Sequence, residues 1–145
     1  MSSSIRPPRQ GLEKLAPYDA KVVDASVVLA SNENPFNLPS ELVARLSSNI
    51  DQFQFNRYPE PTCPRLRALI AEANGVDPEN VLIGNGGDEL LFLMMLAWGG
   101  PGRKLLDMPP TFTMYGIDAR ATGTDVVSIP RTETFDVDEQ AVLDR

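Results

Sequence analysis

The chain has 145 residues, 42% of them hydrophobic, and its 20 acidic and 13 basic side chains give a net charge of −7 at pH 7. This length suits one domain with a real core, and the acidic balance argues against nucleic acid as a partner. With no histidine and one cysteine, the sequence excludes an intrachain disulfide, a Ser-His-Asp triad and the usual zinc sites. Any chemistry must use carboxylates, lysine, tyrosine or a cofactor.

Residues 1–35 are expected to form an N-terminal arm followed by a loop. The first ten residues are polar and lack the apolar core of a signal peptide, so a cytoplasmic location is expected. A short helical turn is predicted over Leu12–Tyr18, ended by Pro17. Ala30–Asn37 is rich in asparagine and turn-forming residues, which is typical of a loop stabilised by its own side chains.

Two amphipathic helices are predicted next. The first begins near Ser40, its expected cap, and the second begins at a Thr62 cap and runs to about Asn74, with Gly75 as its stop. The apolar stripe of the first helix consists of Leu42, Val43, Leu46 and Ile50, and that of the second of Leu66, Leu69, Ile70 and Ala73.

The stretch from Val81 to Leu96 organises the rest of the chain. Val81–Ile83 is predicted to be a short buried strand, and the glycines at 84, 86 and 87 then form a turn. Asp88 and Glu89 begin a helix whose residues 90–96 are almost wholly apolar, as expected for a helix buried against a sheet. A strand, a glycine turn and a helix N-terminus present free backbone N–H groups to an anion, most often a phosphate.

Two common nucleotide motifs do not fit this turn. Glu89 occupies the position of the third glycine in the dinucleotide fingerprint, and the lysine of the nucleotide P-loop is missing. Taken by itself, the turn is better explained as a tight strand-to-helix connection that holds no ligand.

The remaining segments alternate between strand and helix patterns. Strands are predicted at Lys104–Asp107 and Asp125–Ile129, and helices at Thr113–Ala121, stopped at Gly123, and from Asp138 to the end. The order implies a layered α/β fold with at least partly parallel strands. Three strands leave a sheet edge open, so we expect an incomplete piece of a larger sheet.

Five short motifs occur in a specific order and spacing, at Leu15–Tyr18, Ser31–Pro35, Asn56–Pro59, Gly84–Glu89 and Pro110–Phe112. With them the chain resembles the N-terminal part of histidinol-phosphate aminotransferases, which belong to the fold-type-I enzymes that depend on pyridoxal phosphate. The resemblance runs from about Leu12 to the end and covers less than half of a typical family member. It implies that residues 36–145 begin the cofactor-binding large domain, a mostly parallel sheet flanked by helices, and that the domain is truncated.

The resemblance also implies site residues. The backbone amides of Gly87, Asp88 and Glu89 would hold the cofactor phosphate, and Phe112 would stack on the pyridine ring, although Phe112 also fits a core aromatic beside two prolines. Tyr58 would reach the cofactor phosphate of the neighbouring subunit in a homodimer; without the resemblance, Tyr58 is a packed rim residue. Tyr18 and Asn32 would line the substrate end of the site.

The implied reaction is transamination between L-histidinol phosphate and 2-oxoglutarate, with pyridoxal phosphate as electron sink and a lysine that shuttles the proton. The family's catalytic lysine lies in later parts of the fold, so this chain alone is expected to be inactive and to leave its apolar segments partly uncovered. An aromatic or other amino-acid aminotransferase of the same fold stays open, as does a truncated chain that binds phosphate without catalysis. A plain nucleotide-binding α/β domain is disfavoured by the missing glycine and lysine.

Overall fold

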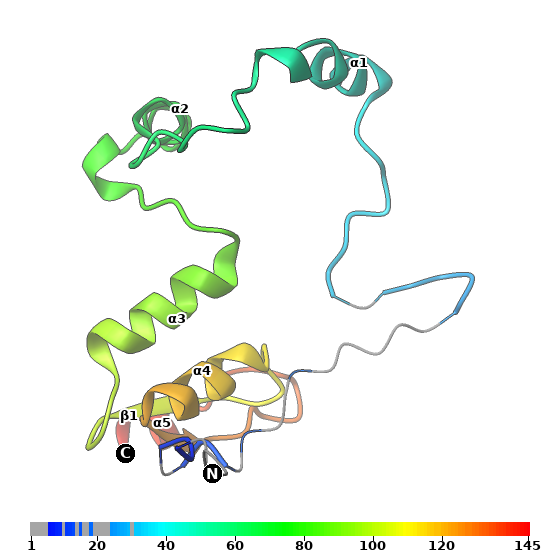
Figure 1. Ribbon diagram of the computed structural model, residues 1–145. Coiled ribbons are helices and arrows are strands. Elements are labelled where there is room, and N and C mark those ends of the chain that lie inside the picture. The colour runs from blue at the N-terminus through cyan, green and yellow to red at the C-terminus, as the bar shows by residue number, and fades with distance from the viewer. Residues whose placement is uncertain (1–5, 10, 14, 16–17, 19–23, 30) are drawn as a thin grey trace, which may run out of the picture. The chain divides into compact units, whose positions relative to one another are not determined.

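The computed structural model describes residues 6–9, 11–13, 15, 18, 24–29 and 31–145 (Figure 1). The chain forms two compact units, one made of Tyr18–Asn80 and the other of Met1–Pro17 together with Val81–Arg145. Both strands found in the described ranges belong to the second of these units. Within the turn predicted over Leu12–Tyr18, the Leu15 amide donates to the Leu12 carbonyl at 3.1 Å, whereas residues 14, 16 and 17 lie outside the described residues, as does a part of the N-terminal arm.

The unit Tyr18–Asn80 consists of short helices joined by loops. Its elements are α1 (Ser40–Ser48), the 3₁₀ turn η1 (Ile50–Gln52), α2 (Pro64–Asn74) and the 3₁₀ turn η2 (Pro78–Asn80). The predicted Ser40 cap is wrong by one position, because Pro39 is the N-cap and its carbonyl accepts from the Val43 amide at 3.0 Å. The apolar stripe of α1 is exposed, so no described part of this unit covers it.

The start of α2 also differs from the prediction. Cys63, not Thr62, is the N-cap, with a left-handed φ of 46°. Pro64 explains the shift: its fixed φ suits the first helical position, and its ring keeps the preceding residue out of the right-handed helical region. The predicted stop is confirmed, since Gly75 ends α2 at a left-handed φ of 65°.

An arginine ties α2 to η2. The guanidinium of Arg67 donates to the carbonyl oxygen of Pro78 through Nε at 3.0 Å and through Nη2 at 2.5 Å. This contact returns the chain against α2 just before Val81.

The second unit is built on a β-α-β segment. Strand β1 (Lys104–Asp107), helix α4 (Met114–Thr122) and strand β2 (Asp125–Ser128) follow one another, and the strands pair in parallel. The register sets Lys104 opposite Asp125 and Asp107 opposite Ser128. The predicted parallel pairing of these segments is therefore confirmed.

The core of this unit is small. Ala119 of α4 is fully buried, and Ile129 and Thr124 are each 5% exposed. The Thr124 hydroxyl accepts from the Gly100 amide at 2.7 Å, which fixes the loop between the helix before β1 and the strand itself. The N-terminal arm joins the same unit, because the Arg9 guanidinium donates to the carbonyl of Ala121 near the end of α4.

Helix α3 (Gly87–Trp98) begins one residue before the predicted start at Asp88, and it is not buried. It packs on α4, yet none of its residues is buried, and Trp98 is 72% exposed. The expectation of a helix covered by a sheet is thus wrong for this chain, and the expectation of partly uncovered apolar segments is confirmed. Among the described residues, no helix has both the length and the apolar character needed to cross a membrane.

The predicted strand at Val81–Ile83 is also wrong. These residues form no strand, because the sheet in the described part of the chain consists of β1 and β2 and offers them no partner. Helix α5 (Glu139–Leu143) is shorter than expected and is capped by Asp138, whose Oδ1 accepts from the Ala141 amide at 3.0 Å.

Replacing Gly123 tests the turn between α4 and β2. Gly123 has a φ of +84°, and a Cβ there would lie 3.4 Å from Arg9 Nη1 and 3.7 Å from Pro101, so space is available and the backbone conformation sets the cost. We expect Gly123→Ala to lower the free energy of unfolding by about 1 kcal/mol, and Gly123→Asn, which tolerates this conformation, to lower it less. Urea denaturation followed by far-UV circular dichroism measures both, and equal stability of Gly123→Ala and the parent chain would contradict the assignment.

Candidate functional site

The N-terminus of α3 is the candidate site. Gly86 is the N-cap, with φ 84° and ψ 173°, and no side chain in the described part of the chain caps the helix there. The amides of Gly87, Asp88 and Glu89 therefore belong to the first turn, where N–H groups have no acceptor within the helix. All three residues are exposed, and a Cβ added at Gly87 would meet nothing within 4 Å. The amides are open to an anion of phosphate size.

The turn before these amides is held by the side chain of Glu89. Its Oε2 accepts from the backbone amide of Asn85 and from Asn85 Nδ2, the latter at 3.3 Å. Gly84 lies against this contact, because a Cβ there would come within 2.9 Å of Glu89 Oε2 and of Leu90 Cδ2. The glycine at 84 thus permits a close approach, while the one at 86 supplies a positive φ.

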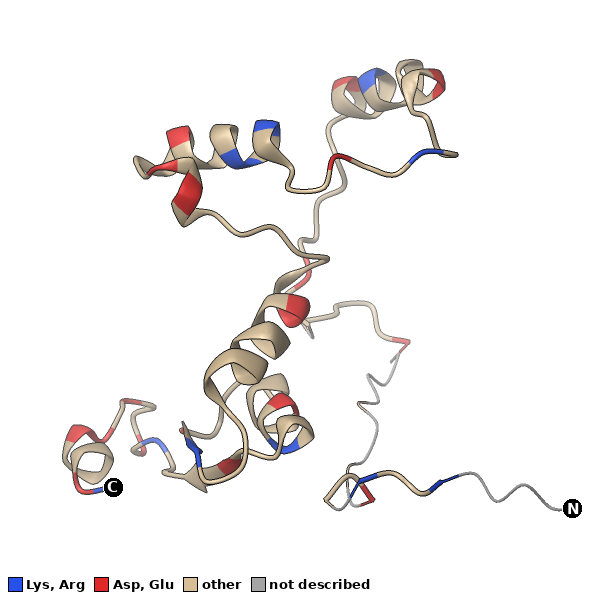
Figure 2. Ribbon diagram, turned by 60° about the vertical axis from the view of Figure 1, so that its left-hand side comes forward, with Lys and Arg blue, Asp and Glu red and all other residues tan. Residues whose placement is uncertain are grey.

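Charge at this end of α3 follows the helix dipole. Asp88 and Glu89 are the charged residues of α3, and Figure 2 shows their red band at one end of a helix that is otherwise uncharged. Carboxylates stabilise the positive end of a helix, and a phosphate is stabilised there for the same reason. A bound phosphate would share this end with two negative side chains.

Phe112 lies in the same unit as the α3 N-terminus. It follows the carboxyl end of β1 and precedes α4 by two positions. The ring is 46% exposed and contacts the Tyr115 ring edge-on, with centroids 5.6 Å apart and an interplanar angle of 83°. The alternative of a core aromatic is wrong in this structure, and one part of the ring is accessible to a flat ligand.

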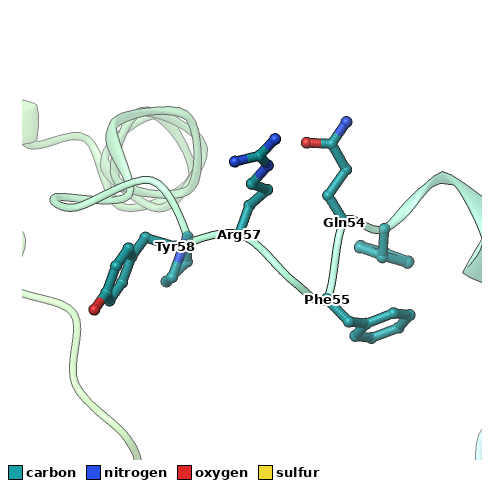
Figure 3. Close-up of a pocket in the computed structure, with 6 residues that line it drawn as sticks. Gln54, Phe55, Arg57 and Tyr58 are labelled. Atoms are coloured by element: carbon teal, nitrogen blue, oxygen red, sulfur yellow. The ribbon is translucent and has the colours of Figure 1, made fainter.

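Tyr58 lies in the other unit, on the loop between η1 and α2. The side chain is 99% exposed, and with Arg57 it lines a hollow of about 420 Å³ in the loop. Figure 3 shows Arg57 and Gln54 on one side of the loop, and Phe55 and Tyr58 turned away from them. The tyrosine side chain is thus presented to solvent, so the interpretation of Tyr58 as a packed rim residue is wrong in this structure.

Tyr18 and Asn32 also belong to the unit Tyr18–Asn80. Tyr18 is 56% exposed, and Asn32 adopts a left-handed φ of 52° that asparagine tolerates. The expected side-chain stabilisation of this loop is present at Asn34, whose Oδ1 accepts from the Phe36 amide at 3.0 Å. Their predicted role at a substrate stays a prediction.

Asp118 is a buried residue of this unit that the sequence pattern did not identify as a site residue. Asp118 of α4 is 6% exposed, and its Oδ2 has no hydrogen-bond partner among the described residues. Burial raises the pKa of the carboxyl above its ordinary value of 3.8, and the charge of Asp88 raises it further. The sequence gives one indication that Asp118 is buried: it lies four residues after Met114 and three before Ala121, on the same face of α4.

Within the described part of the chain, no group of three or more histidine, cysteine, aspartate or glutamate side chains could hold a metal ion. The groups that the candidate site offers are backbone amides, an aromatic face and carboxylates.

Comparisons with known proteins agree on one family. Residues 25–145 match the family model described as aminotransferase class I and II. The histidinol-phosphate aminotransferase of Thermobifida fusca is 40% identical over 141 residues, which are 94% of this chain and 38% of that protein. The chain spans less than two fifths of the length of the curated relatives it matches.

Solved structures give the same picture. LysN, an α-aminoadipate aminotransferase from Thermus thermophilus complexed with N-(5′-phosphopyridoxyl)-L-leucine, is 26% identical, with a TM-score of 0.61 over 73% of this chain and 28% of its own. BacF from Bacillus subtilis, solved in the apo form, has a TM-score of 0.74 over 95% of this chain and 38% of its own at 20% identity, which shows the fold alone. The expected α/β fold with parallel strands is confirmed.

Two glycine replacements test whether the turn is tightly packed at Gly84 and open at Gly87. Gly84→Ala forces a Cβ against Glu89 Oε2 and Leu90 Cδ2, each 2.9 Å away, and should lower the free energy of unfolding by about 1–3 kcal/mol. Gly87→Ala meets nothing within 4 Å and should change stability by less than about 0.5 kcal/mol. The midpoints of urea denaturation of the two variants measure this difference. Equal losses of stability in Gly84→Ala and Gly87→Ala would show that Gly84 is not packed as described.

Proposed function

Because the chain belongs to the class I and II aminotransferase family, we propose that it forms the N-terminal, phosphate-holding part of a pyridoxal-phosphate-dependent aminotransferase of fold type I. The observation that carries the proposal is the open first turn of α3, with free amides at Gly87, Asp88 and Glu89 and no cap from a described side chain. By the family resemblance, we further propose that residues 1–35 are the arm and substrate-side loop, and that residues 36–145 begin the cofactor domain.

The favoured activity is that of a histidinol-phosphate transaminase, which moves an amino group between L-histidinol phosphate and 2-oxoglutarate. Support comes from relatives of that name that are 36–40% identical over about nine tenths of this chain. An aromatic or other amino-acid aminotransferase is the second candidate, because LysN, at 26% identity, is named for another substrate.

The residues present fit a phosphorylated pyridine cofactor. Space above Gly87 and three first-turn amides suit the phosphate, and the half-exposed ring of Phe112 suits a flat heterocycle. When bound, pyridoxal phosphate supplies the electron sink that the reaction needs. This chain's part is to anchor the phosphate, to orient the ring and to exclude water from one of its faces.

The other proposed residues act from the unit Tyr18–Asn80. Tyr58 would extend its hydroxyl to the cofactor phosphate of a second subunit in a homodimer, a role that its 99% exposure permits. Tyr18 and Asn32 would contact the substrate. The proposed setting is cytoplasmic, with small-molecule amino donors and 2-oxo acids as the other partners.

Binding of a cofactor analogue tests this proposal. 4-Deoxypyridoxine 5′-phosphate carries the ring and phosphate but no aldehyde, so it reports on the site without reacting with lysines. We expect Gly87→Ala to weaken its binding about tenfold, since a methyl group would fill the space that the phosphate needs. Isothermal titration calorimetry measures the loss, with Glu72→Ala, at an exposed position of α2 in the other unit, as the control. Unchanged affinity in Gly87→Ala would place the phosphate elsewhere.

The chain by itself is expected not to transaminate. Its lysines are Lys14 and Lys21, which lie outside the described residues, and Lys104, which opens β1 at its amino end whereas Phe112 follows the carboxyl end. Ligands of α/β sheets bind beyond the carboxyl ends of the strands, so Lys104 is not positioned to reach the cofactor. After incubation with pyridoxal phosphate and borohydride reduction, peptide mapping should find no lysine labelled stoichiometrically. One fully labelled lysine together with turnover of histidinol phosphate would contradict this expectation.

A further inference from the structure

Thr124 is a buried polar residue that the proposed function does not use. It lies between the end of α4 and the start of β2 and is 5% exposed. Its backbone amide donates to the Ala119 carbonyl at 2.8 Å, which ties it to the last turn of α4. Its hydroxyl accepts from the Gly100 amide at 2.7 Å, in the loop through which the chain passes from α3 into β1 (Figure 1). One side chain therefore joins the carboxyl end of α3 to the β-α-β segment.

The hydrogen bonds around this hydroxyl run in one consistent direction. Thr122 Oγ1 lies 3.0 Å from Thr124 Oγ1, and it lies 2.9 Å and 3.1 Å from the carbonyl oxygens of Ala119 and Asp118. A carbonyl can only accept, so the single hydroxyl proton of Thr122 goes to the carbonyls, and the hydroxyl of Thr124 donates to Thr122 Oγ1. The Thr124 oxygen then accepts from the Gly100 amide. The link to α3 thus depends on a hydroxyl group at residue 124.

Gly99 brings the end of α3 close enough for this contact. Its backbone is extended, with φ −84° and ψ −158°, so the conformation does not by itself require glycine. A Cβ at this position would overlap with Thr124 Oγ1 and with the Met95 carbonyl oxygen. The chain therefore lacks a side chain at the place where the Thr124 hydroxyl packs against the last turn of α3.

The position of α3 depends on few contacts. The helix packs on α4, yet none of its residues is buried. Its 12 residues span about 18 Å at about 1.5 Å per residue, so a rotation of about 10° at the Thr124 contact would move the amides of the first turn by about 3 Å. A displacement of this size exceeds what a hydrogen bond to a ligand tolerates.

Phe112 belongs to the segment on the other side of this contact. Its carbonyl accepts from the Tyr115 amide of α4 at 3.3 Å, and its ring contacts the Tyr115 ring. Helix α4 is therefore preceded by Phe112 and followed by Thr124. The first-turn amides of α3 and the Phe112 ring are the two parts of the candidate site, and the Thr124 hydroxyl joins the two helices that carry them.

We propose that Thr124 is a positioning residue, whose hydroxyl fixes where the first-turn amides of α3 lie relative to the Phe112 ring. The inference rests on the proposed function and adds to it a residue that acts through α3. The contact favours ligands that carry a phosphate and a flat ring on one molecule, because such a ligand must meet both parts of the site at once. Inorganic phosphate needs only the amides, so its binding does not depend on Thr124.

Thr124→Val tests the proposal, because valine has nearly the shape of threonine but no hydroxyl. Its affinity for 4-deoxypyridoxine 5′-phosphate should fall about fivefold, while its affinity for inorganic phosphate should stay within about twofold of that of the parent chain. Thr124→Ser restores the hydroxyl and should restore the affinity for the analogue. Thr62→Val, at an exposed position of the other unit, should behave like the parent chain. Calorimetry measures binding of the analogue, and the NMR shift of the Gly87 amide measures binding of phosphate.

The two ligands separate the role of Thr124 from the phosphate site itself. Equal changes in both affinities in folded Thr124→Val, or no change in either, would overturn the role of Thr124 and leave the phosphate site standing. If the parent chain fails to bind the analogue or inorganic phosphate, the phosphate site and the role of Thr124 are both overturned.

Hydrogen exchange of the Gly100 amide provides a second measurement on the parent chain, which decides the case if Thr124→Val does not fold. A ligand that contacts both helices disfavours opening of the contact between Gly100 and Thr124. The analogue should therefore slow exchange of this amide about fivefold, whereas inorganic phosphate should not. Exchange that the bound analogue leaves unchanged would overturn the proposal.

Discussion

The close approach at Gly84 is the constraint on which the site depends. Glu89 and Leu90 pack where a side chain at residue 84 would be, and Glu89 returns its carboxylate to the Asn85 amide. This packing ends the extended segment and begins α3 at Gly87 with its first amides uncapped by any described side chain. The Glu89 carboxylate accepts from the Asn85 amide, one residue before the Gly86 cap. Because this carboxylate does not cap the helix, the first-turn amides stay open.

The β-α-β segment of the same unit buries only a small core. Two parallel strands and α4 bury Ala119 and Ile129, but α3 has no buried residue and Val81–Ile83 finds no described strand to pair with. An apolar helix and an unpaired extended segment both need covering elements that the described residues do not contain. The segment with a buried core is thus β1-α4-β2, which contains Phe112. The candidate site lies at the exposed N-terminus of the helix that packs on it, α3.

Local chemistry decided which features could be predicted from sequence. Gly75 and Gly123 stop their helices because only glycine takes a left-handed φ without strain, and the pattern of β1 and β2 was sufficient for parallel pairing. The strand at Val81–Ile83 could not be judged from its own residues, since a strand depends on a partner. Asp118 escaped prediction because its burial depends on how α4 packs against the rest of its unit.

The central claim is that the amides at the start of α3 hold the phosphate of the cofactor. An amide-resolved NMR titration of the chain with 4-deoxypyridoxine 5′-phosphate tests it directly. We expect the largest saturable shifts on the amides of Gly87, Asp88 and Glu89, downfield because of new hydrogen bonds to an anion. Saturable shifts elsewhere, with these three amides unmoved, would contradict the account.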